Sequence, residues 1–191
     1  MNTIEDAVMK TTLNEIRRHI PCKDGWEKLL SHLGKTEADD EPLSLLTVLD
    51  SNGLDDALWC LRAVTGHDKE IRLYTVWCAR QVQHLMTDPR SVAALDVAER
   101  HANGEATDRE LAAARDTAEV AAAEASARDA AWVAVEASAL DAERDALDAA
   151  WAARDAVWIA AEASARDAAW DAARDAQEQE FRAMLKMPED G

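Results

Sequence analysis

Residues 124–132 read EASARDAAW, and the same nine residues return at 162–170, inside a stretch from Ala106 to Ala176 that decides the fold. This stretch holds 31 alanines among its 71 residues and contains no glycine, proline or lysine. Alanine loses no side-chain entropy when a helix forms, and no residue here breaks one. The composition therefore predicts helix throughout the stretch and, with the rest of the chain, an all-α protein.

The stretch could fold as one long helix or as several helices packed together. A single helix of this length would be roughly 105 Å long. Trp132, Trp151 and Trp170 are 19 residues apart, and at about 100° per residue they would fan out around one helix instead of forming a stripe. A repeat of 38 residues is typical of a helix–turn–helix hairpin. We expect alanine-rich packed hairpins, with one very long helix as the alternative.

Helix starts can be read from capping boxes, in which Ser or Thr is followed three residues later by an acid. The pattern occurs at Thr107–Glu110, Ser126–Asp129, Ser138–Asp141 and Ser164–Asp167. These positions predict where the helices of the stretch begin. Its alanine faces should let the helix axes approach closely, with the few large side chains packed between them.

The residues before the stretch predict a bundle of short helices. The expected helices span residues 3–20, 26–33, 43–49, 54–64, 69–86 and 90–102. Ile20 should face inward, Pro21 to Gly25 should end the first helix, Gly34 should end the second, and Asp88 should cap the last. Residues 37–41 should form a loop and residues 50–53 a turn, and no strand is expected. The domain boundaries expected are 1–53, a helical core at 54–104, and an acidic helical array at 105–187 packed on that core.

Charge restricts the partners that the protein can bind. The net charge is −17 over 191 residues, which opposes direct contact with nucleic acid or an anionic membrane and favours a basic protein partner. No apolar run approaches the roughly 18 residues of a membrane span. Three cysteines without close pairing fit a reducing cytoplasm. A homo-oligomer is compatible with this sequence.

Residue patterns for catalysis or metal binding are sparse. His19 and Cys22 lie three residues apart and Cys78 and His84 six apart, but zinc needs four ligands and no further pair completes a site. A Cys–His nucleophilic pair is not excluded by sequence, yet Cys78 lies on an apolar helix face, where thiols are normally inert. The glycines are scattered singly, so no phosphate loop is expected. We predict a protein that is not an enzyme and that binds no metal or cofactor.

Four segments in the middle of the chain carry a family resemblance. They read RLYTVWCAR at 72–80, HLMTDPRS at 84–91, AERHANGEAT at 98–107 and ELAAA at 110–114. Together with the alanine-rich tail, over about residues 54–180, they resemble the immunity-protein domain of bacterial polymorphic toxin systems, of the fifth numbered type, which phages also carry. The resemblance implies a helical protein that binds and neutralises another protein.

The charged residues of the family-like segments allow two interpretations. These residues are Arg80, Asp88, Arg90, Glu99 and Arg100. They could form a partner-binding set. Alternatively, Asp88 caps a helix while the arginines and glutamate hold two helices together at their corner, and the sequence favours this structural role.

The function predicted from charge and resemblance is inhibition by stoichiometric occupation of a toxin or host defence protein with a basic groove. The chain would be an immunity protein or a phage counter-defence protein. The alternatives are a DNA mimic that fills a nucleic-acid-binding groove and a structural helical scaffold. Each Asp of the repeated Arg-Asp pairs is free to face a partner, because adjacent residues on a helix do not face each other. The candidate binding residues are Asp141, Glu143, Asp148, Asp155, Glu162 and Asp171, with Trp151 and Trp158 as anchors or core. The acids could instead serve solubility alone.

Overall fold

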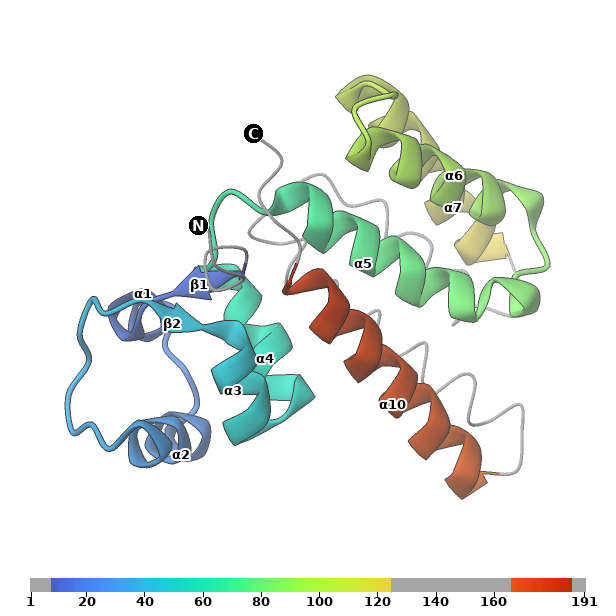
Figure 1. Cartoon of the computed structure of the whole chain (residues 1–191). Coiled ribbons are helices and arrows are strands. Elements are labelled where there is room, and N and C mark those ends of the chain that lie inside the picture. Colours follow the sequence, from blue (N-terminus) through green and yellow to red (C-terminus); the bar gives the residue numbers. More distant parts are fainter. Residues whose placement is uncertain (1–7, 125–165, 187–191) are drawn as a thin grey trace. The chain divides into compact units, whose positions relative to one another are not determined.

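The computed structural model describes residues 8–124 and 166–186 (Figure 1). The described residues are predominantly helical, which confirms the all-α prediction. The chain divides into two compact units, Met1–His67 with Phe181–Gly191, and Asp68–Glu180.

The first unit contains a small β-ladder where the sequence predicted helix. Strand β1 (Lys10–Thr11) pairs antiparallel with β2 (Leu43–Ser44), so that Lys10 lies opposite Ser44. The Met9 amide donates to the Leu185 carbonyl at 3.0 Å, and the Met9 carbonyl accepts from the Leu45 amide at 3.1 Å. These distant partners satisfy the extended backbone, so the helix predicted over residues 8–12 is wrong. Residues 3–7 of that prediction lie outside the described residues.

Helix α1 (Leu13–Arg18) begins directly after the strand, with Thr12 as its N-cap. The Thr12 side chain accepts from the Glu15 amide at 3.1 Å. Ile20 follows with a φ of 58° and a side chain that is 85% exposed. The prediction that Ile20 faces inward is therefore wrong, because the chain leaves the helix before it could return to the buried face.

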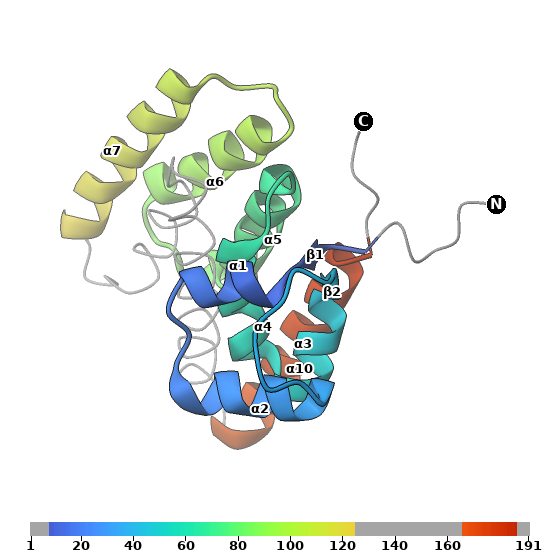
Figure 2. The ribbon, with the colours of Figure 1, turned by 90° about the vertical axis from the view of Figure 1, so that its left-hand side faces the viewer.

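Helix α2 (Lys23–Leu33) stops at Gly34, as predicted, because Gly34 adopts the left-handed conformation with a φ of 66°. Gly25 lies inside this helix, although the sequence placed it in the preceding loop. Figure 2 shows α2 facing the viewer together with α1. The segment from 37 to 41 is a loop, as expected.

The remaining helices of the first unit are α3 (Leu45–Asn52) and α4 (Leu54–Cys60), followed by a 3₁₀ turn at Leu61–Ala63. The turn predicted at 50–53 is wrong except at Gly53, because residues 50–52 complete α3. The last turn of α10 also belongs here, and Arg182 pairs with Asp50 at 2.7 Å. Fully buried side chains form the core: Met9, Leu13, Ile16, Leu45, Val48, Leu61, Phe181 and Leu185.

The second unit contains α5 (Asp68–Gln81), a 3₁₀ turn (Gln83–Leu85), α6 (Pro89–Ala102), α7 (Asp108–Glu124) and most of α10 (Arg166–Met184). The helix predicted over 69–86 is thus a helix followed by a turn. Asp88 caps α6, as predicted, and its carboxylate accepts from the Arg90 amide at 2.8 Å.

Small side chains hold α6 against α7, which lie side by side in Figures 1 and 2. Ala94 of α6 packs against Ala118, with Ala114 beside them. Next to this contact, Leu111 of α7 packs against Ala98 and against Val76 of α5. Because alanine is small, it lets two helix axes approach closely, which is the packing expected from the composition.

The two described ends of the alanine-rich stretch both contact α5. Leu111 packs against Val76, and the Tyr74 hydroxyl donates to the Gln177 carbonyl at 3.4 Å. In one unbroken helix, residues 111 and 177 would be roughly 100 Å apart. The alternative of a single long helix is therefore wrong. Residues 125–165, which carry most of the hairpin prediction, lie outside the described residues.

The two units divide the chain at other places than the boundaries expected from the sequence. Residue 53 lies inside the first unit, between two helices in contact, α3 and α4. Residue 104 lies inside the second unit, between α6 and α7, which also contact each other.

Candidate functional site

Of the eight candidate binding residues, only Asp171 falls in the described part of the chain. It lies exposed on α10. The other seven lie outside the described residues: Asp141, Glu143, Asp148, Trp151, Asp155, Trp158 and Glu162.

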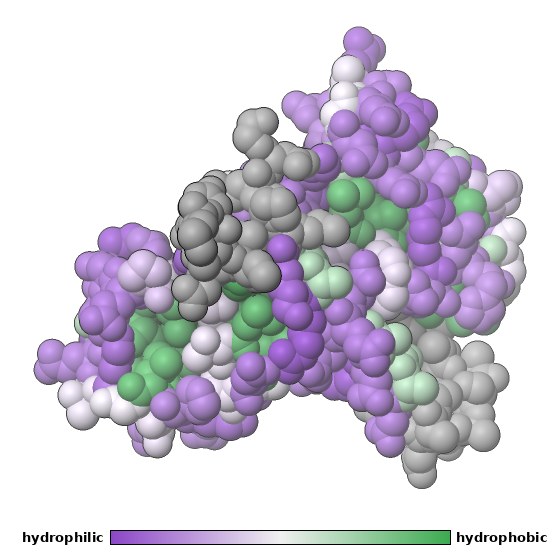
Figure 3. All heavy atoms as spheres, viewed as in Figure 1, coloured by the Kyte–Doolittle hydropathy of each residue, from purple (hydrophilic) through white to green (hydrophobic). Residues whose placement is uncertain are grey.

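The described ends of the alanine-rich stretch expose further carboxylates of the same kind. Asp116 on α7 and Asp175 on α10 are exposed. Among the residues that the structure describes, neither these two nor Asp171 has a hydrogen-bond or ion-pair partner. Hydrophilic residues predominate on the face of α10 seen in Figure 3. The three aspartates are therefore solvated charges that a partner could contact.

Helix geometry explains why Asp116 is left over. Its neighbour Arg115 pairs with Glu119, one turn further along, with a distance of 3.1 Å between Nε and Oε1. Residues four apart on a helix share a face and adjacent residues do not.

Acids at the start of α7 serve the fold instead. The Glu110 carboxylate accepts from the Thr107 amide at 2.8 Å, and the Thr107 hydroxyl accepts from the Glu110 amide at 3.3 Å. The predicted capping box at Thr107 is thus present. The Thr107 amide and then the Thr107 hydroxyl, which both donate to the Glu110 carboxylate, lower the pKa of Glu110 together with Arg100. The Asp108 carboxylate lies within hydrogen-bond distance of His101, with 2.8 Å between Oδ1 and Nε2.

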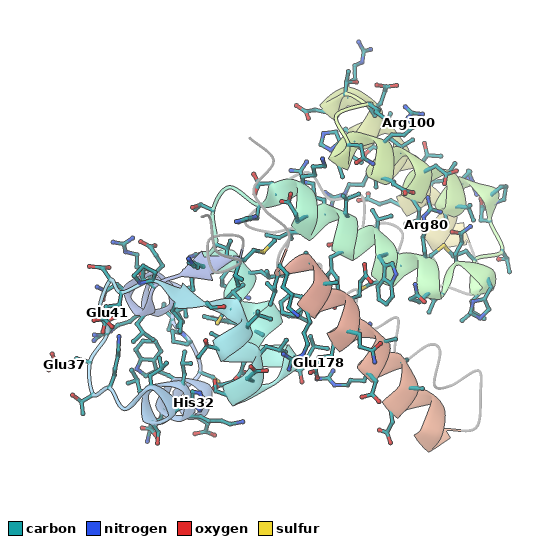
Figure 4. The ribbon with its side chains drawn as sticks, viewed as in Figure 1. His32, Glu37, Glu41, Arg80, Arg100 and Glu178 are labelled. Carbon is teal, nitrogen blue, oxygen red and sulfur yellow. The ribbon has the colours of Figure 1, made fainter. Side chains whose placement is uncertain are left out.

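Arg80, in the last turn of α5, joins this helix to α6 (Figure 4). Its guanidinium donates to Asp96 at 2.9 Å, to Glu99 at 3.2 Å through Nε, and to Gln83 at 2.8 Å. A planar guanidinium with several donors suits this three-way contact better than an ammonium does. Arg80 and Glu99 therefore have the structural role that the sequence favoured.

The other charged positions of the family-like segments also find partners within the chain. The Arg90 guanidinium donates to Asp88 at 2.7 Å. This hydrogen bond, and then the one from the Arg90 amide, lower the pKa of the Asp88 carboxyl. Arg100 lies 3.4 Å from Glu110. These contacts within the chain give each of the charged residues a structural role, and no partner protein is needed to explain their presence.

The cysteines differ sharply in exposure. Cys60 and Cys78 are buried, and burial raises the pKa of each thiol to about 12. Neither thiol can supply a thiolate near neutral pH. Cys22 is exposed. Within residues 8–124 and 166–186, no three His, Cys, Asp or Glu side chains gather in a way that could hold a metal ion.

The first unit contains a cavity that the sequence did not predict, with a volume of about 80 Å³. Figure 3 shows apolar side chains between α1 and α2 on this unit. The cavity is lined by Ile16, Pro21, Cys22, Gly25, Trp26, Leu29, Val48, Asn52, Asp56, Trp59 and Cys60. No signal in the sequence predicted it, because Gly25 was expected in the loop before α2 and the lining residues come from four separate helices and the connection between α1 and α2.

No helix in the described ranges is long and apolar enough to cross a membrane. The chain matches no family model, no curated protein and no solved structure.

Proposed function

We propose that this chain is a non-enzymatic, protein-binding inhibitor that occupies a basic partner through the acidic surface of its alanine-rich region. The observation that carries the proposal is the set of solvated carboxylates at Asp116, Asp171 and Asp175. Acids outnumber arginines 16 to 7 between Ala106 and Ala176. A surface with this excess attracts a positively charged groove and increases the rate of encounter.

The resemblance of residues 54–180 to an immunity-protein domain suggests which partner to seek. It favours a bacterial toxin or a host defence protein, so the chain would act as an immunity protein or as a phage counter-defence protein in the cytoplasm. Burial of Cys60 and Cys78 supports a binding role over thiol catalysis at these two positions.

The first experiment identifies and then characterises the partner. The tagged chain is used to capture proteins from the cells in which it is made, and the captured protein is purified and identified by mass spectrometry. Its association rate with the chain is then measured between low and high salt. We expect the rate to fall steeply as salt rises, because surface charges are screened within about 8 Å at physiological ionic strength.

A charge-neutralised variant tests where the partner binds. Replacing Asp116, Asp171 and Asp175 together with asparagine should weaken binding roughly tenfold or more and leave the circular dichroism unchanged. The matched control replaces three exposed acids of the first unit, Asp24→Asn, Glu37→Gln and Asp40→Asn, and should change affinity far less.

Two results would reject this proposal. One is an affinity indifferent both to salt and to the triple aspartate change, which would leave the acids with a role in solubility alone. The other is an equal loss of affinity in the control variant, which would show that only the net charge of the chain matters and not the position of the acids. If the captured partner binds DNA or RNA and the chain competes for that site, the inhibitor is a nucleic-acid mimic.

A further inference from the structure

We infer that the cavity of the first unit binds the ammonium end of a lysine side chain presented by a protein partner. The inference does not rest on the acidic surface of the alanine-rich region, because the cavity lies wholly within the first unit.

The size of the cavity favours a small group. A buried water needs roughly 10–15 Å³ of such space, so a volume of about 80 Å³ admits several water-sized groups. That is room for the end of one side chain and too little for a nucleotide. The walls are mostly apolar, with Ile16, Leu29 and Val48 among them. An occupant with an apolar stem would therefore be accommodated.

Two tryptophans and one carboxylate specify the charge of the occupant. Trp26 and Trp59 line the cavity together with Asp56. Cations are attracted to the faces of tryptophan rings. Trp59 already makes one such contact, since the Arg62 guanidinium lies 4.2 Å from its ring centroid. Arg62 itself does not line the cavity.

The Asp56 carboxylate is held in place but has no cation. Its Oδ2 accepts from Asn52 Nδ2 at 2.7 Å, and the same Nδ2 donates to the Gly25 carbonyl at 2.8 Å. The Ser51 hydroxyl donates to Asn52 Oδ1 at 2.7 Å, which fixes the amide. Among the described residues, no basic side chain forms an ion pair with Asp56.

The two nearby basic side chains have other contacts. Lys28 donates to the Asn52 carbonyl at 3.4 Å, and Arg62 donates to the Trp59 carbonyl at 2.9 Å. A carboxylate beside two tryptophans in an apolar cavity therefore lacks its counter-ion. An alkylammonium group supplies one, because it combines a compact charge that donates three hydrogen bonds with a flexible apolar stem.

Gly25 adapts the cavity to this carboxylate. A Cβ added at Gly25 would lie 2.7 Å from Oδ2 of Asp56 and 3.1 Å from the Cys22 sulfur. Glycine is less favourable than alanine within a helix, yet residue 25, in the first turn of α2, is glycine. Its absent side chain gives the Asp56 carboxylate its position.

The surface next to the cavity favours a lysine of a protein over a free amine. Pro21 lines the cavity, and its neighbour Ile20 holds its side chain in solvent, 85% exposed, with a left-handed φ of 58°. This conformation is strained for a β-branched residue, and such strain is concentrated at functional sites. An exposed apolar side chain next to a residue of the cavity wall would contact residues on either side of the lysine, which a free amine lacks.

The test is an NMR titration of the full-length chain with the peptide acetyl-Leu-Lys-Leu-amide, observed at the tryptophan indole N–H signals. We expect the signals of Trp26 and Trp59 to shift, whereas that of Trp77, which lies in the second unit, stays fixed. The same peptide with norleucine in place of lysine keeps the stem and removes the charge. The norleucine peptide should bind at least roughly tenfold more weakly, because hydrogen bonds between charged groups are stronger than those between neutral groups.

Variants of the chain locate the contact. Asp56→Asn should weaken binding of the lysine peptide by roughly tenfold or more. Asp55→Asn removes the same charge one residue away and outside the cavity wall, and it should leave binding of the peptide unchanged. Gly25→Ala should also weaken it, because the new Cβ displaces the Asp56 carboxylate. Ile20→Ser should weaken the peptide but leave binding of n-butylammonium unchanged.

Three outcomes would overturn the inference. They are the absence of indole shifts with the lysine peptide, equal binding of the norleucine peptide, and equal loss in Asp56→Asn and Asp55→Asn. If n-butylammonium binds as tightly as the peptide and Ile20→Ser has no effect, the site serves free amines and the assignment to a protein partner is wrong.

Discussion

Residues of one type have different chemistry in this protein because their surroundings differ. Burial raises the pKa of Cys60 and Cys78 to about 12, whereas Cys22 lies exposed at the start of α2. Asp88 and Asp116 form a similar contrast, since Asp88 caps a helix and Asp116 is solvated. The role of each side chain follows from its burial and its partners.

The cysteines give a prediction at this scale. With an aromatic disulfide reagent at pH 8, we expect one thiol to react rapidly in the native protein, and all three after unfolding. A thiol with a pKa near 12 is thiolate in roughly one molecule in ten thousand at that pH. The variant Cys22→Ser should abolish the fast phase. A native protein with two or three fast thiols would contradict the burial of Cys60 and Cys78.

The lowered pKa values of two carboxyl groups lead to a prediction of how stability depends on pH. The pKa of Asp88 is lowered by Arg90, and that of Glu110 by Thr107 and then Arg100. The unfolded chain lacks these contacts and binds protons at higher pH. The stability that the two groups contribute is therefore complete above about pH 4 to 5 and is lost as the pH falls through their lower folded values.

Urea denaturation between pH 6 and pH 3 measures this effect. We expect the free energy of unfolding to fall with pH more steeply in the natural chain than in the double variant Asp88→Asn with Glu110→Gln. Equal slopes would show that the caps do not hold these carboxyls ionised.

At the scale of the element, local capping decides where helices begin, and distant contacts decide which segments become helices at all. Thr107 and Glu110 form their capping box within four residues. By contrast, β1 replaces a predicted helix because the Met9 backbone bonds to Leu45 and Leu185, which are distant in the sequence. Both effects are hydrogen bonding of otherwise unsatisfied backbone groups.

The cap of α7 gives a prediction with a matched control in the same helix. Thr107→Ala should lower the free energy of unfolding by about 1 kcal/mol, the usual cost of losing an N-cap. Thr117→Ala should change it little or raise it slightly, because Thr117 only donates to the Ala113 carbonyl in mid-helix. Equal losses in the two variants, measured by urea denaturation, would show that the cap is not the cause.

At the scale of the whole molecule, residues at both described ends of the alanine-rich stretch contact α5. Spin labels at Asp116 and Asp175 test this within the second unit, in a Cys22→Ser background with cysteines placed at both positions. An unbroken helix would separate them by roughly 90 Å. We expect a pulsed electron resonance distance far below that value, and a distance close to it would contradict the contacts with α5.

The sequence by itself determined the helical class and the local signals of the chain. Alanine content predicted helix, and Gly34, Asp88 and Thr107 each marked a helix end that the structure confirms. These features depend on propensity and on hydrogen bonds between residues at most a few positions apart. Such interactions are present in any window of the sequence, so they can be read without the fold.

Only the tertiary structure decided the rest. It places Ile20 in solvent and residues 10–11 in a strand. It also brings Trp26, Asp56 and Trp59 around one cavity. The sequence does not predict that α2 and α4 come together, because contacts across a core depend on how helices pack. The same limit applies to the surface acids, whose charge is written in the sequence but whose freedom from ion pairs depends on which side chains lie within reach.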